Sequence, residues 1–168
     1  MTLTDYQIQA KRTCPSLGSK EVDILHMKRG VFTECAEIID ALKKRDAYGK
    51  TLDIVNIIEE IGDLCWYVTN WCTFENQTFK ARGSVWVIEK TEQDVDFLID
   101  RIIVESKEDV VDFDDIVDRI YDLCKVFYVE LEHCLEKNIE KLKIRYPEKF
   151  DAEKALNRNL EAEYKVLQ

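Results

Sequence analysis

The sequence has few glycines and prolines, the residues that most often form tight turns and end strands. It contains five glycines and two prolines, whereas a fold of many short strands needs such residues at most of its turns. Their scarcity argues against a β-rich fold and favours long helices. With 168 residues, of which 46% are hydrophobic, the chain is long enough to bury one core. We therefore expect one all-α domain spanning residues 1–168.

Long apolar runs are also missing. No stretch reaches the roughly 18 apolar residues that a membrane-spanning helix needs, and residues 1–10 lack the apolar centre of a signal peptide. The six cysteines form no C-x-x-C pair, and most lie within apolar helical patterns, which is typical of reduced core residues. We expect no membrane association and a cytoplasmic location, in the host cytoplasm if the chain is phage-encoded.

Basic residues are outnumbered by acidic ones, 24 to 34. The formal net charge is -10, so the surface as a whole repels DNA and RNA backbones, and only a small basic group lies near the C-terminal third. A divalent cation bound between the protein and its ligand allows acidic side chains to hold a negatively charged phosphate ligand. The composition therefore predicts a metal–nucleotide ligand and no nucleic-acid polymer as a partner.

Hydrophobic periodicity predicts a bundle of helices with short connections. Residues 76–84 are polar and are expected to form a loop, and Pro147 is expected to end the longest helix. A short strand over residues 85–88 is the alternative to the start of the fourth helix. The predicted fold is an all-α bundle of four to five main helices with a short C-terminal helix. The expected helices span about 4–13, 20–46, 51–74, 85–105, 112–144 and 151–167.

Two pairs of acids occupy the same position on consecutive predicted helices. At about 100° per residue, Glu34 and Glu37 lie about 100° and 160° from the centre of their helix's apolar stripe. Glu60 and Asp63 have the same offsets on the next helix. If the two stripes pack together as an antiparallel hairpin, the four carboxylates converge at the edge of the core.

Four converging carboxylates repel one another unless a cation neutralises them. A ligand set made only of carboxylate oxygens suits hard ions, so the pattern predicts Mg²⁺, with Mn²⁺ as a substitute. Gly30 and Ala41 share the flank of the first pair, so no bulky side chain of that helix crowds it. The alternative is that the acids are ordinary residues of two solvated helix faces.

A second cluster lies on one side of the longest predicted helix. Asn138, Lys141 and Arg145 are spaced so that an amide, an ammonium and a guanidinium suit phosphate oxygens. The alternative is that the two cations only complement the helix macrodipole. Asn56 lies on the flank of the second acidic pair and is either a substrate contact or a surface amide. His26 is a weaker candidate ligand.

These segments together resemble the MazG-like all-α nucleoside triphosphate pyrophosphohydrolases. That family carries E-x-x-E, a spacer and E-x-x-D, followed by a phosphate-contacting N-x-x-K-x-x-x-R helix. The continuation through Arg158 and Glu161 is similar to phage-encoded members. The matching runs are GVFTECAE at 30–37, DALKK at 40–44, YGK at 48–50, EEIGDLCWY at 59–67 and NIEKLKIRYP at 138–147.

The resemblance implies hydrolysis of a (deoxy)nucleoside triphosphate to a monophosphate and pyrophosphate, for nucleotide-pool control or house-cleaning. It also implies a homodimer or homotetramer. The expected substrate-binding residues are Asn56, Asn138, Lys141 and Arg145. The expected catalytic residues, which also bind Mg²⁺, are Glu34, Glu37, Glu60 and Asp63.

Two other functions fit the same pattern. One is phosphoribosyl-ATP pyrophosphohydrolase activity, which the same broad fold group includes, and the other is a non-catalytic helical bundle that binds a nucleotide or a partner. A di-iron oxidase is disfavoured because only one E-x-x-H, at residues 130–133, accompanies the acidic pairs. The base, the sugar, the number of metal ions and the acid that activates the water stay open.

Overall fold

The computed structural model describes residues 1–83 and 91–168, and every regular element within them is helical. This confirms the all-α prediction. A short 3₁₀ helix, η1 (Glu92–Asp94), precedes α4. The α-helices are α1 (Leu3–Lys11), α2 (Lys20–Tyr48), α3 (Ile54–Phe74), α4 (Val95–Glu105), α5 (Phe113–Val126), α6 (Leu131–Arg145), α7 (Ala152–Leu156) and α8 (Leu160–Leu167).

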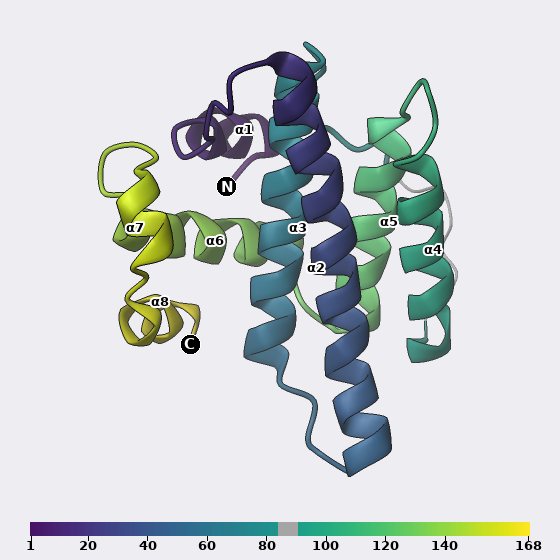
Figure 1. Ribbon diagram of the computed structural model, residues 1–168. Helices are drawn as coiled ribbons and strands as arrows, with labels where there is room; N and C mark the ends of the chain where they lie inside the picture. The colour runs from purple at the N-terminus through teal and green to yellow at the C-terminus, as the bar shows by residue number, and fades with distance from the viewer. Residues whose placement is uncertain (84–90) are drawn as a thin grey trace.

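The two longest helices, α2 and α3, form an antiparallel hairpin at the centre of the molecule (Figure 1). Ser19 caps α2 by accepting a hydrogen bond from the backbone N–H of Val22. Gly49 ends α2 at φ 61°, a left-handed conformation that favours glycine. Asp53 caps α3 through the N–H of Asn56. These local signals fix the register in which the two acidic helices face each other.

The remaining helices cover the hairpin from two sides (Figure 1). Helices α4 and α5 pack together on one side, where Trp71 of α3 meets Phe113 of α5 with ring centroids 5.1 Å apart. On the other side, α6 crosses α3 instead of running along it, and α1 and α8 pack against α6. The crossing helix brings residues from the C-terminal third to the acidic face of α3.

The predicted helix over 112–144 is wrong, because α5 ends at Val126 and α6 begins at Leu131. Tyr128 has φ 55°, and the N–H of Val129 donates to the carbonyl of Cys124 while that of Tyr128 donates to Lys125. This is a Schellman helix ending. Such endings usually use glycine, so a tyrosine at this position gave no signal in the sequence.

The predicted C-terminal helix over 151–167 is likewise divided into α7 and α8. Helix α7 ends at Leu156. Asn159 then accepts a hydrogen bond from the N–H of Ala162 and caps the start of α8 at Leu160. The fourth predicted helix is confirmed only from Val95 onward, and the possible strand at 85–88 lies outside the described residues. Residues 77–83 form no regular element, as predicted for the loop.

The prediction for the cysteines agrees with the structure. All six cysteines are free thiols, and all but Cys14 are buried. Among residues 1–83 and 91–168, no helix is both long enough and apolar enough to cross a membrane.

Candidate active site

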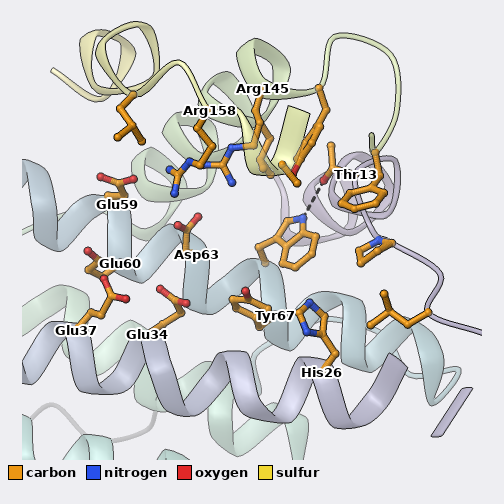
Figure 2. Close-up of a pocket in the computed structure, with 18 residues that line it drawn as sticks. Thr13, His26, Glu34, Glu37, Glu59, Glu60, Asp63, Tyr67, Arg145 and Arg158 are labelled. Carbon is orange, nitrogen blue, oxygen red and sulfur yellow. Dashed lines mark hydrogen bonds between the residues drawn. The ribbon is translucent and has the colours of Figure 1, made fainter. Parts of the chain in front are cut away.

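A cavity of about 600 Å³ lies between the α2–α3 hairpin and the C-terminal helices. Figure 2 shows acids along one wall, two arginines opposite them, and a group of rings at the far end. Helices α2 and α3 supply the acids, α6 and the α7–α8 connection supply the arginines, and the α1–α2 connection closes the far end. The cavity therefore joins segments from both ends of the chain.

The acidic wall brings together three of the four predicted metal ligands. One carboxylate oxygen from each of Glu34, Glu37 and Glu60 lies within 4.8 Å of the other two. Glu34 and Glu60 are only 8% and 6% exposed, whereas Glu37 is exposed. Burying carboxylates this close together is unfavourable unless they are protonated or a cation neutralises them.

The electrostatics of this cluster follow from its burial and crowding. Burial, followed by the charges of Asp63 and Glu37, raises the pKa of Glu34 above its usual value. Burial and the neighbouring carboxylates, Glu37 first among them, raise the pKa of Glu60 as well. Both carboxyl groups hold their protons more tightly than free glutamate does. A cation that binds here therefore replaces protons.

Asp63, the fourth predicted ligand, is held from behind by α6. Its Oδ1 accepts a hydrogen bond from Asn138 Nδ2 at 2.6 Å, and its Oδ2 lies 2.5 Å from Lys141 Nζ. Lys141 is fully buried and also pairs with Glu59 at 3.1 Å. Tyr6 completes the network by donating to Asn138 Oδ1 at 2.8 Å. This network fixes the orientation of Glu59 and Asp63, two of the three acids of α3 that line the cavity.

The predicted substrate-binding residues thus occupy three different places. Arg145 lines the cavity, whereas Asn138 and Lys141 are buried against Asp63 and are not among the residues that line it. Asn56 lines a separate hollow of about 420 Å³, on the other side of Glu37. His26 lines the main cavity, at its ring-rich end.

The wall opposite the acids is a pair of arginines joined by one carboxylate. Arg145 donates from Nε and Nη2 to both oxygens of Glu163, at 3.0 and 2.5 Å. Arg158 donates from Nε and Nη2 to Glu163 Oε2, at 3.2 and 2.7 Å. Burial opposes ionisation of Glu163, but the hydrogen bonds from both arginines lower its pKa below the usual value. Both guanidinium groups point toward Glu59 and Asp63 (Figure 2).

The far end of the cavity is lined mainly by aromatic side chains. Trp66 donates from Nε1 to Thr13 Oγ1 at 2.9 Å, which fixes the indole. The ring of Tyr67 packs edge-on against Trp66 and His26, with centroids 5.0 and 5.8 Å away. Tyr146 and Phe150 add two more rings from the chain after α6. Apolar and aromatic surface of this kind suits a flat base.

Two glycines set the spacing of the helices around the site. A Cβ at Gly30 would lie 2.1 Å from the Tyr67 ring, so the gap that Gly30 leaves on α2 is filled by that ring. A Cβ at Gly62 would lie 2.9 Å from Asn138 Cβ and 3.1 Å from the Cys134 carbonyl. The absence of a side chain at Gly62 therefore lets α6 approach α3 closely enough to hold Asp63.

Sequence reasoning missed Glu163 entirely and assigned no role to Arg158. Glu163 looks like any acid in the first turn of a short helix, and its two partners lie 18 and 5 residues away. No helical spacing connects these three residues. The buried position of Glu163, 2% exposed, became visible only in the structure.

Comparison with known proteins identifies the hairpin that carries the acids. Searches of curated proteins and of solved structures returned no significant match. Residues 23–93 match the model of the MazG nucleotide pyrophosphohydrolase domain. This segment contains α3, nearly all of α2 and all four predicted acids, so it confirms the family resemblance seen in the sequence. The chain therefore contains a segment, residues 23–93, that matches a MazG nucleotide pyrophosphohydrolase domain.

Proposed function

We propose that the protein hydrolyses (deoxy)nucleoside triphosphates to a nucleoside monophosphate and pyrophosphate, using Mg²⁺. The observation that carries the proposal is a single 600 Å³ cavity with carboxylates on one wall, guanidinium groups on the other and aromatic rings at one end. A triphosphate needs cationic partners, and a base needs a flat apolar surface. The cavity offers both along its length.

The acidic cluster fits Mg²⁺ by its donor set. Glu34, Glu37 and Glu60 converge on one point, and Asp63 faces the same cavity. These four carboxylates would hold the ion, since Mg²⁺ prefers oxygen ligands and Mn²⁺ accepts the same set. When bound, Mg²⁺ supplies positive charge that offsets the negative charge of the acids and the phosphates.

The opposite wall orients the phosphates. Arg145 is held by Glu163 and faces the acids, so its guanidinium is placed to bind phosphate oxygens without further ordering. Lys141 and Asn138 act through Asp63 and keep that carboxylate pointed into the cavity. The polar side chains of α6 therefore contribute in two ways: Arg145 directly, and Lys141 and Asn138 through Asp63.

Water attacks phosphorus, and its proton passes to a carboxylate. Glu34 is suited to accept it because burial and the neighbouring carboxylates raise its pKa to about 7, near neutral pH. The bond between the α and β phosphates breaks, and pyrophosphate leaves. Trp66 and Tyr67 hold the base at the other end of the cavity and keep the reacting phosphates near the acids.

A homodimer or homotetramer is part of the proposal. Phe97 and Val104 lie on the same face of α4, two turns apart, and are 58% and 47% exposed, which offers apolar surface for contact between copies. Light scattering on the purified protein measures the assembly. A monomer at all concentrations would contradict this part of the proposal and leave the reaction untouched.

The reaction is tested by pyrophosphate release from a panel of ribo- and deoxyribonucleoside triphosphates and phosphoribosyl-ATP, with Mg²⁺ and with EDTA. We expect metal-dependent release from triphosphates, with one or two preferred bases. Turnover of phosphoribosyl-ATP alone would replace the proposed substrate. No turnover of any nucleotide would favour a non-catalytic binding bundle.

A further inference from the structure

Arg158 lies outside the matched segment 23–93 and outside the phosphate-contacting motif of α6. It belongs to the three-residue connection between α7 and α8, yet it lines the cavity together with residues of α2 and α3. Glu163, almost fully buried, receives two hydrogen bonds from it. A connection residue that is held this firmly at a cavity wall is a candidate for ligand contact.

Packing alone does not explain the position of Arg158. Helix α7, which precedes it, has no buried residue, and Leu156 is 85% exposed. The described ion pairs of Arg158 run to Glu163, and its side chain remains 36% exposed. The shared carboxylate therefore determines where this guanidinium sits, and it leaves part of the group open to the cavity.

The group of Arg145, Arg158 and Glu163 carries one net positive charge, which favours an anion. Within this group, two guanidinium groups share one carboxylate. Arg158 lies farther from the aromatic rings than Arg145, at the end of the cavity beside Glu59 (Figure 2). It also lines an adjoining hollow of about 380 Å³, whose other charged lining residues are Glu59, Glu161 and Glu163. A triphosphate whose base meets the rings places its terminal phosphates at this end.

We propose that Arg158 binds the β and γ phosphates, the part that leaves as pyrophosphate, and that Glu163 positions Arg158 for this contact. The inference rests on the proposed function for the orientation of the nucleotide. It makes the C-terminal segment a determinant of the preference for triphosphates over shorter nucleotides. It also predicts that pyrophosphate and nucleoside monophosphate, the two products, depend on different residues.

The test compares Arg158→Ala and Arg158→Lys with a matched control, Lys165→Ala, which changes an exposed cation on α8. Affinities for inorganic pyrophosphate and for a nucleoside monophosphate are measured by calorimetry with Mg²⁺ present. We expect Arg158→Ala to weaken pyrophosphate binding about tenfold or more, because hydrogen bonds to a charged group are lost. Monophosphate binding should change by less than about threefold. Arg158→Lys should restore part of the loss.

Glu163→Gln separates positioning from contact, because it keeps the shape of the side chain and removes its charge. Because Glu163 also holds Arg145, we expect this variant to weaken pyrophosphate binding at least as much as Arg158→Ala does, with a less than additive loss in the double variant. The ratio of kcat/KM for a triphosphate to that for the matching diphosphate should fall in both variants. Circular dichroism and the melting temperature show whether each variant is folded.

Three outcomes would overturn the inference. They are no pyrophosphate binding by the wild type, an unchanged pyrophosphate affinity in Arg158→Ala, or equal weakening of both products. The last would mean that Arg158 only anchors α8. A wild-type protein that turns over no nucleotide but binds pyrophosphate through Arg158 would contradict the proposed function. It would still support the contact between Arg158 and pyrophosphate.

Discussion

The acidic wall comes from two consecutive helices of one hairpin, whereas the arginine wall comes from α6, a three-residue connection and α8. The acids are paired at i and i+3 on each helix, so elementary helix geometry places them on one flank. The arginines are joined only by a buried carboxylate that follows both of them in the chain. The convergence of the acids could therefore be predicted from their spacing in the sequence. The pairing of the arginines could not, because it depends on how α6 crosses α3.

The two walls also differ in their need for a partner. The carboxylates of Glu34, Glu37 and Glu60 crowd one another and raise the pKa of two of their members. The arginine wall is already neutralised in part by Glu163. The carboxylates of the acidic wall therefore repel one another until a cation binds between them. The arginine wall is already ordered and positively charged before an anion binds. Variants at each wall should fail in different ways.

The largest effect is expected for Glu60→Ala in the acidic wall. Turnover should fall by more than about a hundredfold, since residues that merely support metal ligands are worth about 10–100-fold. The melting temperature in EDTA should stay the same or rise, because one of the repelling carboxylates is removed. Glu108→Ala, at an exposed position, is the control. A collapsed fold in Glu60→Ala would mean that the carboxylate is structural.

Lys141→Met tests the support behind the acidic wall. Lys141 is fully buried between Glu59 and Asp63, so its removal leaves two partly buried acids without their cation. We expect a loss of about 2–3 kcal/mol in the free energy of unfolding, measured with urea. Lys143→Met, on the exposed face of the same helix, should cost far less. Equal losses in the two variants would contradict the positioning role.

Gly30→Ala tests how the hairpin shapes the aromatic end. The new methyl group would meet the Tyr67 ring at 2.1 Å, so that ring must leave its place. Overpacking of this kind costs about 1–3 kcal/mol, and KM for the triphosphate should rise. Adding Tyr67→Ala should remove the clash, so the double variant should lose less stability than the sum of the single variants. Simple additivity would mean that the two positions are independent.

The smallest effect is a pH dependence of stability in the metal-free protein. The folded-state pKa values of Glu34 and Glu60 are raised, so the unfolded chain releases protons first as pH rises above about 4.5. Stability in EDTA should therefore fall from about pH 5 toward pH 8. Mg²⁺ competes with those protons and should raise the melting temperature more at pH 8 than at pH 6. An equal rise at both values would argue against a metal at this cluster.

Much of the fold was predictable because its helices carry their own start and stop signals. In the structure, Ser19 and Asp53 cap the starts of α2 and α3, and Gly49 ends α2 in a left-handed conformation. The break at Tyr128 was not predictable, since a tyrosine in a left-handed conformation has no propensity signal. That break turns α6 across α3, and the whole second wall follows from it.

The candidate site was predictable in part for the same reason. Helix geometry predicted that Glu34, Glu37 and Glu60 would converge. The same reasoning could not distinguish Lys141, which faces Asp63 in the interior, from Arg145, which faces the cavity. Both lie on one side of α6, and only the close approach of α3 at Gly62 separates their environments. The roles of these residues, the metal and the extent of the domain stay predictions, as do the phage origin and the cytoplasmic location.

The central claim is that acids and arginines on opposite walls act together on one triphosphate and release pyrophosphate. The most direct measurement is phosphorus NMR of a preferred triphosphate incubated with the purified protein and Mg²⁺, beside a matched sample with Glu60→Ala. The account predicts equal amounts of monophosphate and pyrophosphate from the wild type and unchanged triphosphate from the variant. Diphosphate and inorganic phosphate as the products, or equal turnover by the two proteins, would contradict it.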